Sequence, residues 1–138
     1  MKILLATILI LIFLAIAAIH FYWALGGRKW VNLALPTADG STPIFKPRML
    51  ETLAVAVGFL GFVYIVACEA NLLNHSNLLT KYGSWFIPIV FVIRAIGEFR
   101  YVGFFKKIKN TDFGKMDSKY YSPLCLAIGV MTLTIKFL

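Results

Sequence analysis

Residues 3–25 read ILLATILILIFLAIAAIHFYWAL, a continuous apolar stretch interrupted only by Thr7 and His20. A helix of about 20 apolar residues crosses the hydrocarbon core of a bilayer, so this stretch alone predicts a transmembrane helix. Small residues near Ala15 resemble the cleavage site of a signal peptide, but the apolar run continues past them to Leu25. We therefore expect the segment to be retained as a first membrane span.

Three further apolar stretches follow, at about residues 49–70, 82–99 and 120–138. Of the 138 residues, 60% are hydrophobic and only 14% are charged, which excludes an ordinary soluble surface. The sequence therefore predicts an all-α fold, an integral membrane four-helix bundle in which residues 1–138 form a single transmembrane domain. The first and third connections between its helices are the longer ones.

The formal net charge of +8 is unevenly divided between the two sides of such a bundle. The side with both termini holds three lysines, Lys2, Lys81 and Lys136. The side with the two longer connections holds ten basic residues: Arg28, Lys29, Lys46, Arg48, Arg100, Lys106, Lys107, Lys109, Lys115 and Lys119. Because Lys and Arg are enriched in cytoplasmic loops, we expect a bacterial cytoplasmic (inner) membrane protein with both termini outside. The same charge indicates anionic lipid headgroups as partners, and not nucleic acid.

The two longer connections have different patterns. Residues 26–48 alternate apolar and polar side chains around the turn dipeptide Asp39-Gly40, which permits a short hairpin or a lid. The prolines of this segment favour an irregular ordered loop equally. Residues 100–119 carry lysines among aromatics, and Phe104-Phe105 is typical of an interfacial segment pressed into lipid headgroups.

Ionisable and aromatic residues gather at the predicted cytoplasmic ends of the helices. Ionisable groups within a bilayer are costly unless they are paired and face the interior, so a cluster drawn from several helices is a candidate site. We interpret it as a ligand-binding or structural polar cluster, with no catalytic residue assigned. It comprises His20, Trp23, Glu51, Arg94, Glu98, Arg100 and Tyr121.

Arg94 and Glu98 are four residues apart and would share one helix face, which Glu51 could approach from a neighbouring helix. We predict that Arg94 points into the bundle and forms a salt bridge with Glu98 or Glu51. This arrangement is compatible with a structural clasp, with a ligand-binding or catalytic site, and with simple surface charges.

His20 is most simply a hydrogen-bonding core residue with Trp23 one turn below, although a proton carrier and a metal or haem ligand remain alternatives. His75 falls on the opposite side of the predicted bundle, so the sequence predicts no shared metal centre and leaves any cofactor unknown. Cys68 and Cys125 lie in apolar segments at different depths, and we expect both thiols to be unpaired.

Three stretches carry a family resemblance: HFYWALGG at 20–27, RAIGEFRYVGFFK at 94–106 and DSKYYSPLC at 117–125. Together they resemble a bacterial family of small integral membrane proteins that is defined only as an uncharacterised domain of unknown function. The resemblance covers nearly the whole chain. It implies a four-helix membrane protein and groups these residues, and it implies no reaction or ligand.

The leading hypothesis is a non-enzymatic membrane protein that binds or transports an apolar or amphipathic small molecule. The polar cluster would lie at its cytoplasmic mouth, with the first connection as a lid. One alternative is a membrane-embedded enzyme acting on a lipid or isoprenoid-like substrate, with His20 or Glu98 as general acid or base and Arg94 holding an anionic group. Another is an accessory subunit or a structural homo-oligomer.

Overall fold

The computed structural model describes residues 1–138 and contains helices as its only regular elements. In chain order these are α1 (Lys2–Ala24), α2 (Val31–Ala34), α3 (Met49–Glu69), α4 (Leu78–Ile96), α5 (Asp112–Met116), the π-helix η1 (Asp117–Tyr121) and α6 (Ser122–Phe137). The last three follow one another without a break over Asp112–Phe137. That composite helix, α1, α3 and α4 are each long and apolar enough to cross a membrane, which confirms the predicted all-α class with four spans.

Helix α4 begins and ends earlier than predicted. Its N-terminus is fixed by a capping box, in which Asn77 Oδ1 accepts from the Thr80 amide at 2.9 Å and Thr80 Oγ1 accepts from the Asn77 amide at 3.1 Å. It ends at Ile96 because Gly97 takes a φ of 89°, outside the helical region. Glu98 is therefore not on the helix, and the prediction that it shares a helix face with Arg94 is wrong.

The fourth span begins about two turns before the predicted start near residue 120. Thr111 is its N-cap, with Oγ1 accepting from the Gly114 amide at 3.0 Å. Its first turns are polar, so a search for apolar runs places them in a loop. Within η1 the backbone widens by one residue, and the Ser122 amide donates to the Asp117 carbonyl five residues back.

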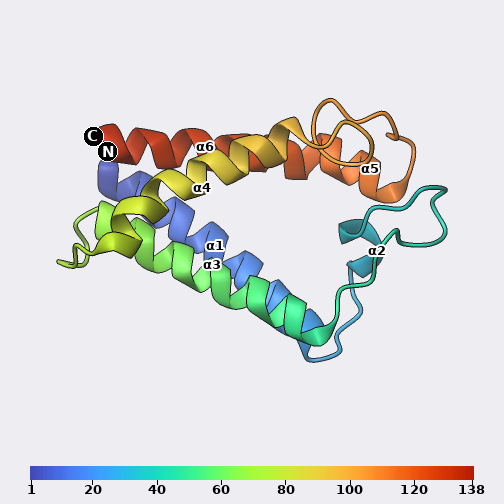
Figure 1. The fold of residues 1–138 in the computed structure, drawn as a ribbon, viewed down its shortest axis with the longest axis horizontal. Helices are drawn as coiled ribbons and strands as arrows, with labels where there is room; N and C mark the ends of the chain where they lie inside the picture. The colour runs from blue at the N-terminus through green and yellow to red at the C-terminus, as the bar shows by residue number, and fades with distance from the viewer.

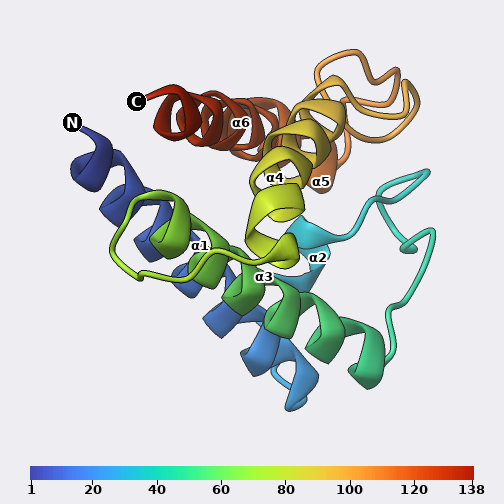
Figure 2. The ribbon, with the colours of Figure 1, turned by 60° about the vertical axis from the view of Figure 1, so that its left-hand side comes forward.

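The long helices form two pairs. In both ribbon views α1 runs beside α3, and α4 runs beside α6 (Figures 1 and 2). The pairs meet at the end that holds both chain termini, which we call the closed end, and diverge toward the other, the open end (Figure 1). Rings join the pairs, since Phe13 of α1 lies 5.8 Å from Phe59 of α3 and 5.7 Å from Phe91 of α4, measured between ring centroids.

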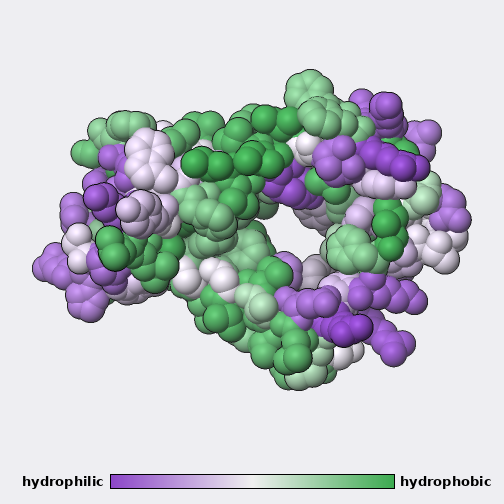
Figure 3. Space-filling view, viewed as in Figure 1, coloured by the Kyte–Doolittle hydropathy of each residue, from purple (hydrophilic) through white to green (hydrophobic).

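Divergence of the pairs leaves a hollow between them. The space-filling view shows an opening bounded by the two helix pairs and, at the open end, by the segment around α2 (Figure 3). Hydrophobic residues surround the opening toward the closed end, and hydrophilic residues gather on its rim at the open end (Figure 3). The helices also expose many large apolar side chains, such as Leu4, Val57 and Ile93, as is typical of helices that contact lipid.

The first connection is neither a full hairpin nor wholly irregular. It contains the single turn of helix α2 and one isolated antiparallel bridge, between Thr37 and Pro43. Asp39 organises the turn inside that bridge, with Oδ1 accepting from the Ser41 amide at 3.0 Å and from the Thr42 amide at 3.3 Å. The hydrogen bonds from Ser41 and then Thr42 lower the pKa of Asp39 to about 2, because they favour the carboxylate.

Candidate functional site: a buried aspartate network at the open end

The most deeply buried charges of the chain are Asp117, at the start of η1, and Lys106, in the loop between α4 and α5. Neither side chain has any exposed surface, and Lys106 Nζ lies 2.9 Å from Asp117 Oδ2. A buried lysine is costly unless its ammonium protons are all matched, and here they are. Besides Asp117, Nζ donates to the Gly103 carbonyl at 3.0 Å and to Ser118 Oγ at 2.7 Å.

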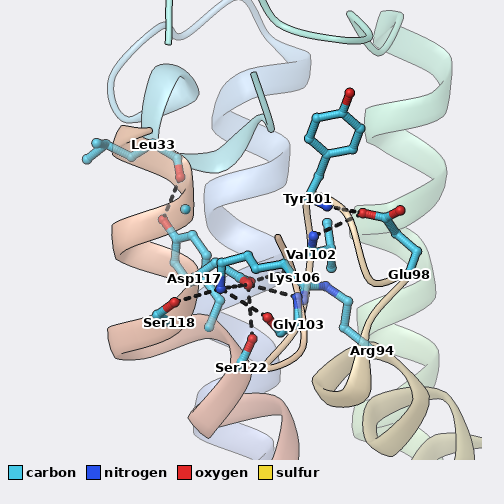
Figure 4. A network of polar contacts seen from close by, with 12 residues as sticks. Leu33, Arg94, Glu98, Tyr101, Val102, Gly103, Lys106, Asp117, Ser118 and Ser122 are labelled. Carbon is cyan, nitrogen blue, oxygen red and sulfur yellow. Dashed lines mark hydrogen bonds and ion pairs between the residues drawn. The ribbon is translucent and has the colours of Figure 1, made fainter. Parts of the chain in front are cut away.

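Asp117 collects donors from three parts of the chain (Figure 4). Its Oδ2 accepts from Lys106 Nζ, from the Gly103 amide at 2.9 Å and from Ser122 Oγ at 3.0 Å. Its Oδ1 accepts from Arg94 Nη2 at 2.8 Å, which ties the end of α4 to η1. Four donors therefore converge on one carboxylate, three of them at Oδ2, so Asp117 is the centre of the network.

The contact with Asp117 uses only one nitrogen of the Arg94 guanidinium, Nη2. The Arg94 side chain is 33% exposed, yet Nη1 is buried and has no hydrogen-bond partner. Nη1 is the one buried side-chain nitrogen or oxygen in the chain without such a partner. The rings of Phe13, Phe59 and Phe91 form what we call the aromatic junction. Because Arg94 follows Phe91 by three residues, it lies one helical turn beyond this junction, toward the open end.

Two glycines let the loop after α4 fold tightly enough to reach Asp117. Gly97 and Gly103 both have φ near +90°, a conformation that residues with a Cβ rarely adopt. A Cβ on Gly103 would collide with the Ile96 carbonyl, and one on Gly97 with the Val102 carbonyl. The close approach returns the chain to α4, where the Phe104 amide donates to the Ala95 carbonyl at 2.8 Å.

The predicted partners of Arg94 are elsewhere, so that part of the prediction is wrong. Glu98 turns away from Arg94 and its Oε1 accepts from the amides of Tyr101 and Val102, within its own loop (Figure 4). Glu51 caps α3, with Oε2 accepting from the Arg48 amide at 2.9 Å. Each carboxylate accepts hydrogen bonds from backbone amides a few residues away in sequence. These local hydrogen bonds form in preference to an ion pair with the more distant Arg94 guanidinium.

His20 and Trp23 contact each other, as expected for residues one turn apart. Their ring centroids are 5.1 Å apart, and His20 also lies 5.8 Å from the Phe59 ring, so it extends the aromatic junction toward the open end. His20 Nδ1 is 2.8 Å from the Ile16 carbonyl and must donate to it, which leaves Nε2 as an acceptor in the neutral ring. Trp23 Nε1 donates to the Lys29 carbonyl at 2.7 Å.

The two remaining predicted residues differ in their relation to the network. Tyr121 belongs to η1 and its hydroxyl donates to the Leu33 carbonyl at 3.1 Å, which links α2 to the fourth span (Figure 4). Arg100 lies in the exposed loop, with its guanidinium carbon 5.1 Å from the Tyr101 ring. Cys68 and Cys125 are both free thiols, which confirms that prediction.

The residues that complete the network were not among the predicted site. Lys106, Asp117 and Ser118 lie in the segment predicted to be an interfacial connection, and Ser122 lies at the start of the predicted fourth span, where it was not assigned to the cluster. One signal could have found them: the stretches 94–106 and 117–125, which carry the family resemblance, contain every side chain that contacts Asp117. Arg94 also needed a carboxylate, and the chain has only six acidic residues.

The chain matches no curated protein and no solved structure. A family model does match it, over residues 13–132, which include α3, α4, most of the composite fourth helix, about half of α1 and the whole Asp117 network. The description of that family is "Protein of unknown function (DUF3995)". The expected resemblance to an uncharacterised family is thereby confirmed, and the chain belongs to the DUF3995 family.

Proposed function

We propose that this protein is a small integral membrane protein that binds an apolar or amphipathic small molecule between its α1–α3 and α4–α6 helix pairs. The observation that carries the proposal is the opening in Figure 3, which is apolar toward the closed end and hydrophilic on its rim. A mostly apolar concavity with a few polar groups is the usual form of a small-molecule site.

Named side chains support this use of the opening. Phe59 and Phe91, from opposite pairs, lie 6.3 Å apart between ring centroids and mark the point from which the pairs diverge. Beyond them toward the open end, α1 carries His20 and α4 carries Arg94. Both have hydrogen-bonding capacity that the chain does not use, at His20 Nε2 and Arg94 Nη1. A ligand with an apolar body and a polar group fits these two kinds of contact.

The segment around α2 is suited to act as a lid. It lies across the open end, and the hydroxyl of Tyr121 holds it through one hydrogen bond to the Leu33 carbonyl. This connection can open without unfolding the long helices, because only its contacts with Tyr121 and with α5 need to separate.

The proposed orientation follows from charge. The open end carries ten Lys and Arg residues in its connections and the closed end carries three, which favours an inner-membrane protein with its open end in the cytoplasm and its termini outside. With Cys68 and Cys125 replaced by alanine, a cysteine appended after Leu138 should react with a membrane-impermeant thiol reagent on intact cells. Labelling only after lysis would reverse this orientation.

Binding in the opening can be tested with tryptophan fluorescence in nonionic detergent. A variant that keeps only Trp23 (Trp30→Phe, Trp85→Phe) reports on the opening, because Trp23 packs against His20. Titration with a phospholipid brominated on its chains should quench Trp23 saturably. The matched control keeps only Trp85, which lies at the closed end beside Phe137 and Lys136.

Trp85 should be quenched only in proportion to the brominated lipid in the micelle, without saturation. Equal, unsaturating quenching of the two tryptophans would contradict a site in the opening.

A further inference from the structure

The charges around Asp117 do not balance. Arg94 and Lys106 are two cations on one carboxylate, so the network carries a formal charge of +1. The other nearby carboxylate, that of Glu98, is bonded to loop amides and does not contact Arg94. A surplus cation at the edge of an apolar opening attracts an anion.

The surplus positive charge coincides with one unpaired donor, Arg94 Nη1. A paired contact of both Arg94 terminal nitrogens would need both Asp117 oxygens, and Oδ2 already accepts from Lys106, Gly103 and Ser122, so Arg94 reaches the carboxylate through Nη2 alone. Nη1 therefore has two hydrogens and no acceptor, although it is buried. Leaving a charged donor buried and unpaired is costly, and such groups are found where a ligand completes them.

Asp117 also fixes the guanidinium in place. The Nη2–Oδ1 contact of 2.8 Å holds Arg94 from one side, while 33% of the side chain remains exposed. A guanidinium held this way loses little freedom when it takes a second anion, and its planar fork suits the paired oxygens of a phosphate.

The apolar surroundings select the kind of anion. One helical turn from Arg94 toward the closed end, Phe91 begins the aromatic junction that includes Phe59 and Phe13. An anion attached to hydrocarbon can place its charge at Arg94 and its chain along these helices, whereas a free anion leaves the apolar surface uncovered. The basic open end would also concentrate anionic lipids around the mouth of the opening.

We infer that the occupant of the opening is a membrane lipid with an anionic phosphate headgroup, and that the partly exposed Arg94 guanidinium, which has one nitrogen without an acceptor, recognises this phosphate. The inference rests on the function proposed above and adds the chemical class of the ligand. Asp117 is a positioning residue for Arg94, and Lys106 balances Asp117 from its other side.

The test compares two lipids with identical brominated chains, phosphatidylglycerol and diacylglycerol, which lacks the phosphate, in the variant that keeps only Trp23. One added charge-assisted hydrogen bond should make the half-saturating concentration of phosphatidylglycerol about tenfold lower. Arg94→Lys retains a cation for Asp117 but lacks the second nitrogen, and it should lose most of this preference. Lys107→Gln removes an exposed charge from the same end and should keep it.

Each other outcome overturns a defined part of the inference. Saturable binding of both lipids with equal affinity leaves the proposed function intact and removes the headgroup assignment, and the absence of any saturable quenching overturns both. A preference that survives in Arg94→Lys shows that the Arg94 guanidinium is not the group that recognises the phosphate. Displacement of the lipid by an equal concentration of inorganic phosphate shows that a free anion is the ligand, which overturns the lipid as occupant.

Discussion

At each end of the molecule a lysine meets a carboxylate and a serine. At the open end Lys106 Nζ contacts Asp117 and Ser118, and the lysine and aspartate side chains have no exposed surface. At the closed end Lys136 Nζ lies 3.5 Å from Glu69 and 2.7 Å from Ser84 Oγ, with the lysine and glutamate side chains 17% and 24% exposed. The same three residue types therefore occur in two environments.

The lysine–carboxylate pair therefore contributes differently at the two ends. Lys136 can exchange Glu69 for water or headgroups, and it also stacks 4.9 Å from the Trp85 ring, so its ion pair is one of several alternatives. Lys106 has no alternative to its network. Partly exposed pairs are worth little, whereas stranding one member of a buried pair is expensive. The open end thus depends on complete pairing, and the closed end does not.

The largest expected effect is the loss of the buried carboxylate. Asp117→Asn strands Lys106 and one side of Arg94, and it should lower the free energy of unfolding by about 3–5 kcal/mol. Glu69→Gln, the matched change at the closed end, should cost about 0–1 kcal/mol. Both can be measured by unfolding in mixed micelles of dodecyl sulfate. Similar losses at the two ends would show that burial does not distinguish them.

A smaller effect is expected from the loop that delivers Gly103 to Asp117. Gly103→Ala forces a Cβ against the Ile96 carbonyl at a φ of +90°, and overpacking of this kind costs about 1–3 kcal/mol. Gly58→Ala on α3 is the control, since a Cβ there meets no atom within 4 Å, and it should be neutral or stabilising by up to about 1 kcal/mol. Equal destabilisation by both changes, measured in the same micelles, would argue against a closely packed loop.

The smallest effect concerns Asp39, an exposed carboxylate in the first connection. It is less buried than either of the two lysine–carboxylate pairs. Its pKa of about 2 lies below the ordinary 3.8, so its hydrogen bonds stabilise the turn above pH 4 and are lost as pH falls through 2. The Ser41 amide chemical shift should follow this titration, and Asp39→Ala should flatten it. A midpoint near 3.8 would mean that the turn does not favour the carboxylate.

The four spans could be predicted because continuous apolar runs, such as residues 3–25, have few alternatives to crossing lipid. Helix ends were predicted less well, since Asn77, Gly97 and Thr111 act through capping bonds and backbone angles that hydropathy does not record. That Arg94 would form an ion pair could also be predicted, because an intramembrane cation needs a partner. Its partner could not be predicted, because helical spacing favoured Glu98 over a residue 23 positions away.

The wide turn at η1 also sets a limit on how the chain tolerates length changes. An α-helix turns each residue by about 100°, so the extra residue of a π-turn rotates everything before it relative to everything after it. This offset brings Ser122 onto Asp117 across five positions, while α6 keeps Ile128 and Ile135 in the core. Deleting one residue from 118–121 would leave the apolar part of the span unchanged and still rotate Asp117 away from Ser122. The number of residues in this segment therefore matters as much as their identity.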